Sequence, residues 1–548
     1  MTALSRAIAA AAEDIRSWPR WLVLSLAGVG FVLFWGIPTI IIPLATDQIL
    51  FSLGARTILD GGQLYRDYWE IKPPLIHLIY TIPFALAGEH MEGIRVLDLV
   101  NTALAMGAIF LLSRRLFNER AAILAAAFYA FTYLTWSQMD GLAEAESFMA
   151  APLALAFFLY RPEDGRRGAW PGALAAGLLL GAAFALKTTA LLFVLGLPAA
   201  ELFLREAKTW TVRGALQRLT LAAAGFLLVQ GVLAGYLAIG GALGAFVDIQ
   251  RNYTAAYNGY RWAPEGSHLR FLVDGTSIWI KSAAFILVPA AVALFFALYR
   301  PRHTTGIALL ALLVALGVLG VWWQGKMYRY HWVIMIPLLA PLAGYAIDQL
   351  LGLFSTLARP RMWMAQALLA GGLLVLATDL LQDTYDNYRT LANFADGSVS
   401  RREVEARFNP QLVINRELVD YVRTNGDTDD KLFIWGFWPI AYFWAEQPLV
   451  TRFVDNHGLR ATWSPDSWRQ ELLDDLEAAP PRFLAVARYD NQPWLVGTTE
   501  TSDEHLRDSF PELRRFVEGQ YVPVRDMGLF LLYERIAVRT ERPTQTTR

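Results

Sequence analysis

The chain has 548 residues, of which 55% are hydrophobic and 18% charged, and its formal net charge is −1. Because soluble domains carry about a quarter charged residues, this composition indicates an integral membrane protein, and the balanced charge excludes a general affinity for nucleic acid. The chain has no Cys, which excludes disulfides, thiolate metal sites and a cysteine nucleophile.

Apolar stretches long enough to cross a membrane recur up to about residue 380. A helix needs roughly 17–25 apolar residues to cross ~30 Å of hydrocarbon, and on this basis we expect about eleven transmembrane helices. They fall near 21–44, 94–112, 121–138, 146–160, 171–186, 188–204, 217–240, 276–298, 305–322, 331–351 and 362–380. Residues 171–204 would form one helix of about 51 Å, which is too long for a single span, so we expect the chain to turn at Lys187.

The stretch 73–89 decides the topology of everything that follows it. If it does not cross the membrane, the short loops rich in Arg, such as "SRRLFNER" and "RPEDGRRG", fall on the side of the N-terminus. Short loops dense in positive charge are typically cytoplasmic. We therefore expect a cytoplasmic N-terminus and a long outer loop, 45–93. Within this loop, 73–89 would be an interfacial helix starting at Pro73-Pro74, since Pro is tolerated in a first helical turn.

A region with the character of a soluble domain follows the last expected span. Its short apolar runs "KLFIWGF", "RFLAVARY" and "GLFLLYER" alternate with helix-like stretches such as "DSWRQELLDDLEAA". This alternation is typical of an α/β domain. We therefore divide the chain into a membrane module, residues 1–381, and an extracytoplasmic α/β domain, residues 382–548.

Ionisable residues gather on the expected outer side of the membrane module. They include Asp47, Glu70, Lys72, Asp140, Glu144, Glu146, Lys187, Arg329 and His331. Ionisable groups at membrane depth are costly and are candidates for function. The alternative is solvation by water and lipid headgroups. In that case Asp47 would cap an interfacial helix that begins just after Thr46, and Lys72 would reach toward the headgroups.

Three local patterns leave alternatives open. Asp140 and Glu144 have i,i+4 spacing, which places both on one face if the span continues as a helix, whereas in a turn they would be solvated. Tyr253 and the other aromatic residues of "QRNYTAAYNGYRW" suit either the face of a sugar ring or the aromatic belt of a membrane interface. Arg95 and Asp98, at i,i+3 spacing, favour a local ion pair.

A series of motifs in chain order carries a family resemblance. They are "TDQ" after the first span, "GGQLYRDYWEIKPPL" in the outer loop, "RRLF", "SQMDGLAEAE", "MYRYHWVIMIPLLAPLAG" and "LFIWGFWPIAYFWAEQPLVTRF". In these motifs the chain resembles the GT-C superfamily of polytopic glycosyltransferases. The resemblance is to the bacterial relatives of protein O-mannosyltransferases and of the lipid A aminoarabinose transferase, and it extends over essentially the whole chain.

The resemblance implies a GT-C fold and an inverting transfer of sugar from a polyprenyl-phosphate donor. The acceptor would be a hydroxyl of a glycan, lipid or protein, on the outer face of a bacterial inner membrane. Cations would stabilise the leaving phosphate, and a carboxylate would accept the hydroxyl proton. Family analogy makes Asp47 the catalytic base, Asp140 a second catalytic acidic residue and Lys72 a phosphate ligand, and similar proteins carry basic residues where this chain has Lys187 and Arg329. By their chemistry and position we also expect Glu70, Glu144, His331 and Tyr253 to bind substrate.

The resemblance does not extend to a metal site. The protein mannosyltransferases that the chain resembles carry an Asp-Glu pair where this chain has Asp47-Gln48, and the seven His residues are scattered. We therefore predict no metal ligands, although carboxylates can bind a hard cation and a role for Mg²⁺ or Mn²⁺ is left open. The alternative function is a lipid or glycolipid transporter. Transporters often contain internal repeats, and the sequence shows none.

Overall fold

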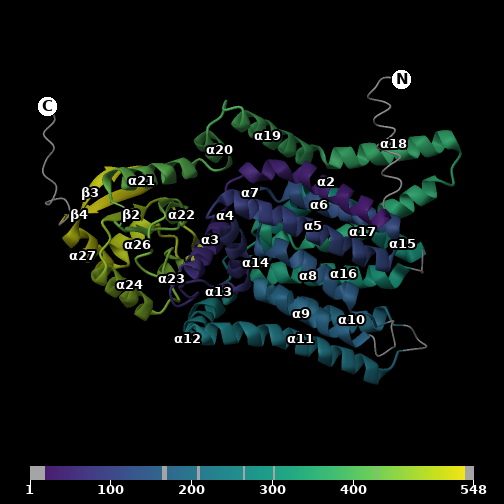
Figure 1. Cartoon of the computed structure of the whole chain (residues 1–548), viewed down its shortest axis with the longest axis horizontal. Helices are drawn as coiled ribbons and strands as arrows, with labels where there is room; N and C mark the ends of the chain where they lie inside the picture. Colours follow the sequence, from purple (N-terminus) through teal and green to yellow (C-terminus); the bar gives the residue numbers. More distant parts are fainter. Residues whose placement is uncertain are drawn as a thin grey trace.

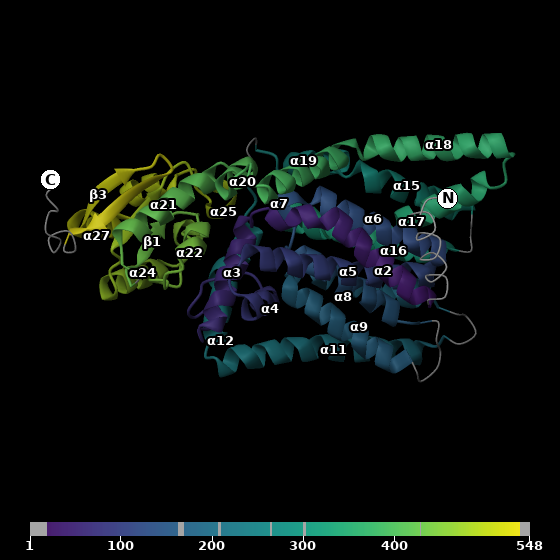
Figure 2. The same cartoon turned by 45° about the horizontal axis from the view of Figure 1, so that its top comes forward.

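The computed structural model describes residues 19–162, 169–205, 210–262, 266–299, 303–427 and 429–536. A bundle of helices forms one part of the molecule, and a smaller part with a β-sheet lies at one end of it (Figures 1 and 2). The expected cytoplasmic N-terminus falls on residues 1–18, outside the described ranges.

The helices of the bundle include short 3-10 segments (η1, η2, η5) and one π-turn (η3). In chain order they are α2 (Arg20–Gly36), η1 (Ile37–Ile41), α3 (Thr46–Leu59), α4 (Leu75–Ala87), α5 (Met91–Leu116), α6 (Glu119–Trp136), α7 (Gln138–Gly141), α8 (Ala145–Leu159), α9 (Ala169–Leu186), η2 (Thr188–Leu195), α10 (Gly196–Phe203), α11 (Val212–Ile239), α12 (Leu243–Ile249), η3 (Gln250–Thr254), α13 (Ala255–Gly259), α14 (His268–Ser282), α15 (Ala284–Tyr299), α16 (Thr304–Gln324), η5 (Arg329–Trp332), α17 (Met335–Phe354), α18 (Arg359–Leu376) and α19 (Thr378–Ala395).

Within the described ranges, five helical segments are long and apolar enough to cross a membrane. They are α2 with η1, α5, α11, α16 and α17, and the number rises to seven if the bent pairs α14–α15 and α18–α19 each count as one span. The count of about eleven from the sequence stays a prediction, since α4, α8, α9 and the η2–α10 segment are shorter apolar helices. As expected, helix α9 ends just before Lys187.

Two expected spans differ in shape from the sequence prediction. The range 276–298 contains a bend of 94° between α14 and α15, and 362–380 ends at a bend of 61° between α18 and α19. In the first case Lys281 and Ser282 interrupt the apolar run where α14 ends. Hydropathy averaged over a window does not register such a break, because the apolar residues on either side of it dominate the mean.

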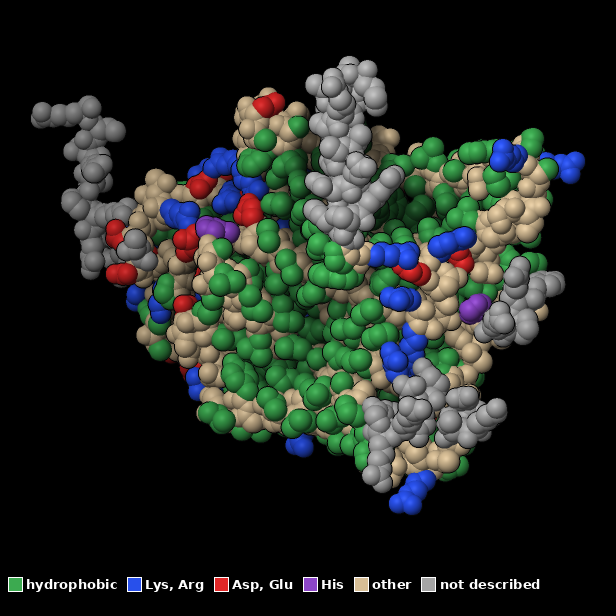
Figure 3. Space-filling view, turned by 45° about the vertical axis from the view of Figure 1, so that its right-hand side comes forward, with side chains coloured by type: hydrophobic (Ala, Val, Ile, Leu, Met, Phe, Trp, Pro, Cys, Tyr) green, Lys and Arg blue, Asp and Glu red, His purple; other side chains and the backbone are tan. Residues whose placement is uncertain are grey.

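The outer surface of the bundle is rich in exposed apolar side chains. Leu86 of α4, Ile239 of α11 and Leu298 of α15 are 83%, 92% and 79% exposed. On one face of the molecule hydrophobic side chains form a broad area, with Lys and Arg toward its edge (Figure 3). Apolar surface of this extent is unfavourable in water and suits contact with lipid. Together with the long apolar helices, it indicates a multi-pass membrane protein.

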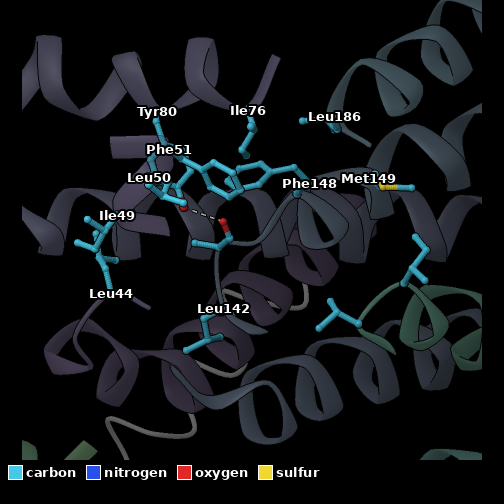
Figure 4. Close-up of a cluster of buried hydrophobic side chains, with 14 of the residues drawn as sticks. Leu44, Ile49, Leu50, Phe51, Ile76, Tyr80, Leu142, Phe148, Met149 and Leu186 are labelled. Carbon is cyan, nitrogen blue, oxygen red and sulfur yellow. Dashed lines mark hydrogen bonds between the residues drawn. The ribbon is translucent and has the colours of Figure 1, made fainter. Parts of the chain in front are cut away.

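Helices α3 and α4 form a packed pair at the end of the bundle that faces the smaller part (Figures 1 and 2). Helix α4 begins after Pro74, where the sequence predicted a helix start. Leu50 and Phe51 of α3 and Tyr80 of α4 gather with Phe148 of α8 in a buried cluster (Figure 4). The two helices approach closely at Gly54, where a Cβ would overlap the His77 ring of α4.

The C-terminal part combines helices with one mixed sheet. Its elements are α20 (Arg401–Phe408), α21 (Gln411–Asn425), β1 (Leu432–Trp435), α22 (Ile440–Ala445), α23 (His457–Arg460), α24 (Asp466–Ala478), β2 (Phe483–Ala487), α25 (Pro493–Val496), α26 (Ser502–Asp508), α27 (Pro511–Gln520), β3 (Tyr521–Asp526) and β4 (Phe530–Arg535).

The sheet has the strand order β1-β2-β4-β3. Strands β1 and β2 are parallel, with Ile434 opposite Ala485, whereas β4 is antiparallel to both β2 and β3. Every residue of β1 and β2 is buried, as expected for parallel strands covered on both faces. The three apolar runs noted in the sequence contain β1, β2 and β4, and the domain boundary expected after residue 381 falls inside α19.

Candidate active site

A cavity of about 340 Å³ lies between the α3–α4 region of the bundle and the C-terminal part. Seven of the nine predicted site residues line it: Asp47, Glu70, Lys72, Asp140, Glu144, Tyr253 and Arg329. The C-terminal part contributes Phe437, Asp455, His457, Gln492, Trp494 and Leu495. The structure therefore brings together residues from the segment 45–93, from the α7–α8 turn and from segments several hundred residues later.

The centre of the cavity holds an ion pair. The Lys72 ammonium lies 2.6 Å from a carboxylate oxygen of Asp47 and 4.5 Å from the centre of the Phe51 ring. Burial favours a raised pKa for Asp47, but the Lys72 charge, with hydrogen bonds from Lys72 and Tyr330, holds this pKa below its usual value. Burial likewise opposes the Lys72 charge, yet the nearby carboxylates of Asp47, Glu70 and Glu144 raise the Lys72 pKa. Both groups are therefore charged at neutral pH.

Asp47 is free to form this pair because its neighbour caps the helix. The Gln48 side chain accepts a hydrogen bond of 3.1 Å from the backbone N–H of Ala45, just before α3. Helix α3 begins at Thr46, as the sequence predicted. The alternative in which Asp47 serves as the helix cap is therefore wrong, and the Asp47 carboxylate points to Lys72 instead.

The loop that carries Lys72 is fixed by hydrogen bonds on both sides. Glu70 accepts from the backbone N–H groups of Ile71 (2.7 Å) and Lys72 (3.1 Å). The Tyr65 hydroxyl donates to the Lys72 carbonyl (2.8 Å), and the Gln250 side chain donates to the Ile71 carbonyl (3.1 Å). Because its backbone is held in this way, the Lys72 ammonium has a defined position, and Glu70 contributes by shaping the loop.

The acidic pair Asp140 and Glu144 does not share a helix face. Helix α7 ends at Gly141 and α8 begins at Ala145, with Ala143 in the left-handed region at φ 59°. Both side chains nevertheless line the cavity. Glu144 accepts a hydrogen bond of 3.2 Å from Gln48, and burial, together with the Asp47 charge, raises the Glu144 pKa well above its usual value.

Arg329 lies at the cavity, whereas Lys187 and His331 do not line it. Arg329 donates hydrogen bonds to the last residue of α6 and the first residue of α7. Lys187 pairs with Glu146 and lies 5.2 Å from the centre of the Tyr330 ring. His331 packs on the same ring and lines a second, small cavity. Lys187 and His331 therefore form a layer beside Tyr330, which itself faces the central cavity.

Arg95 and Asp98 take separate partners in place of the expected local ion pair. Arg95 donates hydrogen bonds to two carbonyls just before α3 and to one just after α7. Asp98 accepts from the Tyr133 hydroxyl at 2.7 and 2.9 Å. Through its three hydrogen bonds Arg95 connects the two segments that carry the acidic residues of the cavity. The sequence did not indicate the partners of Arg95 and Asp98, because they are distant in the chain.

Tyr253 lies in the π-turn η3 and is almost fully buried. Its ring makes an edge contact with Trp69 at 5.0 Å and lies parallel to Tyr257 at 6.0 Å. Its contact with Trp468 reaches into the C-terminal part. Tyr253 is therefore not part of an aromatic belt at a membrane surface, and with Tyr257 it forms an aromatic wall of the cavity.

The residues that the C-terminal part contributes were missed by sequence reasoning. Asp455 accepts a hydrogen bond of 2.9 Å from the backbone N–H of His457, and a ring nitrogen of His457 lies 2.8 Å from the side-chain amide oxygen of Gln492. Burial, with the charges of Glu70 and Asp47, raises the Asp455 pKa to about 7. The available sequence signal was the run of three polar residues, Asp455 to His457, in "FVDNHGLR".

Comparison with known proteins supports the resemblance seen in the sequence. A family model described as dolichyl-phosphate-mannose-protein mannosyltransferase matches residues 71–234. The crystal structure of ArnT from Cupriavidus metallidurans, bound to undecaprenyl phosphate, superposes with a TM-score of 0.57 at 14% identity, over 94% of this chain and 98% of that one. The chain has the GT-C fold. The expected resemblance to GT-C membrane glycosyltransferases is thus confirmed.

A second solved structure is less similar to the chain. The archaeal oligosaccharyltransferase AglB from Archaeoglobus fulgidus, in complex with an inhibitory peptide and a dolichol-phosphate, gives a TM-score of 0.49 at 12% identity, over 96% of this chain and 75% of that one. No curated protein matches the chain in sequence. The family match includes Lys72, Asp140, Glu144 and Lys187, whereas Asp47 lies before it.

Proposed function

We propose that the chain is an inverting glycosyltransferase that moves a sugar from a polyprenyl-phosphate donor to an acceptor hydroxyl. The observation that carries the proposal is the Asp47–Lys72 pair, at 2.6 Å, in a cavity lined by polar and aromatic side chains. The mannosyltransferase family match, which contains Lys72, supports the reaction class. The shared fold with a protein crystallised with undecaprenyl phosphate supports the type of carrier.

The leaving group determines what the cations do. A phosphate leaves without protonation, but negative charge grows on its oxygens as the bond to the sugar breaks, and fixed cations stabilise that charge. Lys72 and Arg329 are the Lys and Arg side chains among the described residues that line the cavity. We assign the phosphate to these two groups. Lys187, which is paired with Glu146 and lies behind Tyr330, would stabilise the phosphate only through its charge and without direct contact.

Asp47 is the base in this proposal, and because it is paired with Lys72, its basicity depends on whether the donor is bound. An entering phosphate competes with Asp47 for the Lys72 ammonium, which is a principal cause of the lowered Asp47 pKa. When Lys72 turns to the phosphate, the Asp47 pKa rises and the carboxylate becomes a stronger base. Donor binding therefore prepares the base for the acceptor.

The reaction itself is a single displacement. The acceptor oxygen bonds to the anomeric carbon on the side opposite the phosphate, and its proton passes to Asp47. The bond between the carbon and the phosphate oxygen breaks, and its electron pair remains on the phosphate. The configuration at the anomeric carbon is thereby inverted. Asp140 and Glu144, at the same cavity, would orient the acceptor hydroxyl.

The proposed location is the outer face of a bacterial inner membrane, with the C-terminal part outside the cytoplasm. The short loops rich in Arg support this orientation. Since the chain has no Cys, single introduced cysteines can report it. Ser398→Cys should react with a membrane-impermeant maleimide in intact spheroplasts, and Ala358→Cys only after permeabilisation. The reverse pattern would contradict the orientation.

A donor panel tests the function. The protein in nanodiscs would be given undecaprenyl-phosphate-linked mannose, glucose, galactosamine or arabinose with a membrane extract as acceptor source. We expect release of undecaprenyl phosphate with one of these donors and a product of inverted anomeric configuration by NMR. Retention of configuration, or no release with any donor, would contradict the proposal.

A further inference from the structure

The C-terminal part contributes a second polar cluster to the cavity, separate from the Asp47–Lys72 pair. It consists of Asp455, His457 and Gln492, and we call it the C-terminal polar cluster. All three side chains line the cavity, and Asp455 and His457 are buried. The Phe437 ring packs on the His457 ring with 3.7 Å between their centres, so the imidazole has little freedom to move.

Hydrogen bonds between the bundle and the C-terminal part hold this cluster in place. Arg56 of α3 donates to the carbonyls of Tyr442 (3.2 Å) and Phe443 (2.9 Å). The Trp69 backbone N–H donates to the Arg452 carbonyl at 2.9 Å, and Lys326 donates to the Trp494 carbonyl at 2.8 Å. The cluster is therefore held at a fixed position relative to Lys72, as a binding site for a small polar ligand requires.

The chemistry of the cluster differs from that of a phosphate site. Burial and the nearby Arg460 charge lower the His457 pKa to about 3, so the imidazole is neutral. Arg460 itself is occupied, since it donates hydrogen bonds to Ser502 and to the Glu500 carbonyl. A carboxyl, a neutral imidazole and an amide can donate to and accept from hydroxyl groups, but they offer no positive charge to an anion.

Aromatic rings complete the surroundings of the cluster. Phe437, Tyr257 and Trp494 line the same cavity. A sugar ring has apolar C–H faces and a rim of hydroxyl groups, so it suits a site in which polar groups converge beside aromatic faces. A lipid chain would offer no hydrogen-bonding group to the polar side chains of Asp455, His457 and Gln492 that line the cavity, which disfavours it as the ligand.

We propose that the C-terminal polar cluster binds the hydroxyl groups of a sugar whose reacting end lies at Asp47 and Lys72. This inference rests on the proposed function and extends it by assigning a sugar site to the C-terminal part. The sugar is either the one that the donor carries or part of a glycan acceptor. Both present the same hydroxyl chemistry, and a binding experiment separates them.

The test compares two carriers that differ only in the sugar. Affinities for bare undecaprenyl phosphate and for the undecaprenyl-phosphate-linked sugar used in turnover would be measured in nanodiscs for wild type, Asp455→Asn and Gln492→Ala. Asparagine keeps an oxygen that can accept from the His457 backbone, so this variant retains the local structure. Asp526→Asn is the matched control, because Asp526 is exposed and lies in the same part of the chain.

We expect Asp455→Asn and Gln492→Ala to weaken binding of the sugar-linked carrier about tenfold, with bare carrier unchanged, if the site holds the donor sugar. If it holds a glycan acceptor, both affinities stay unchanged and the KM for the extract acceptor rises about tenfold instead. Neither change, or equal weakening of both carriers, overturns the inference. Absence of carrier binding by the wild type would instead count against the proposed function.

Discussion

On the bundle side of the cavity a half-buried carboxylate and a half-buried ammonium lie 2.6 Å apart, whereas the C-terminal side presents Asp455, His457 and Gln492 and, among its described lining residues, no Lys or Arg. The bundle side is thus suited to a phosphate and a proton transfer, and the C-terminal side to neutral hydroxyl groups. In the proposed reaction this separation would let one cavity hold the leaving phosphate and the sugar without competition for the same side chains.

Removing Lys72 should have the largest effect on activity, and it tests the bundle side of the cavity alone. Lys72→Ala should lower the rate of undecaprenyl phosphate release by about a hundredfold to a thousandfold, by loss of the cation that stabilises the leaving phosphate. It also leaves Asp47 buried without its partner, which destabilises the fold. The double variant Asp47→Asn with Lys72→Ala should therefore melt at a higher temperature than Lys72→Ala. Equal activity of Lys72→Ala and Lys281→Ala, an exposed control, would contradict the assignment.

The close packing of α3 on α4, which supports the bundle side of the cavity, can be tested without changing a charged residue. Gly54→Ala should destabilise the protein by about 1–3 kcal/mol, because the added methyl group overlaps the His77 ring. Gly107→Ala in α5 is the matched control, since a Cβ there meets no neighbouring atom. It should leave the melting temperature unchanged or slightly raised. Similar melting temperatures for the two variants in detergent would argue against close packing of α3 on α4.

The C-terminal side should respond to pH through Asp455. Its pKa of about 7 in the folded protein lies above that of an exposed Asp, so the folded state binds more protons than the unfolded state in this window. The stability that Asp455 contributes is therefore present at low pH and is lost as the pH rises toward 7. The fall in melting temperature between pH 5 and pH 7 should be smaller in Asp455→Asn than in wild type and Asp526→Asn. An unchanged fall would show that Asp455 titrates normally.

Chelation of divalent cations should have the smallest effect. Among the described residues, no group of three or more His, Asp and Glu side chains is arranged to hold a metal ion, and Lys72 supplies positive charge at the cavity. We expect release of undecaprenyl phosphate to proceed at an unchanged rate in EDTA. A loss of activity that Mg²⁺ or Mn²⁺ restores would instead assign part of the phosphate charge to a metal.

The two sides also differ in how well the sequence predicted them. The starts of α3 and α4 follow from local signals, and the motif around Lys72 belongs to a loop that lines the cavity. Asp455 and Arg95 were different, because their roles depend on partners from distant segments. The bend between α14 and α15 was missed for a related reason, since an apolar average hides a local break. Local chemistry was predictable, and the closure of the cavity by the C-terminal part was not.

The central claim is that Asp47 accepts the acceptor proton, and one measurement tests it directly. The rate of undecaprenyl phosphate release and the affinity for the sugar-linked carrier would be determined for Asp47→Asn and for Asp60→Asn, an exposed control at the end of the same helix. We predict a rate at least about a hundredfold lower for Asp47→Asn, with donor affinity retained, and wild-type values for Asp60→Asn. A wild-type rate for Asp47→Asn would contradict the account.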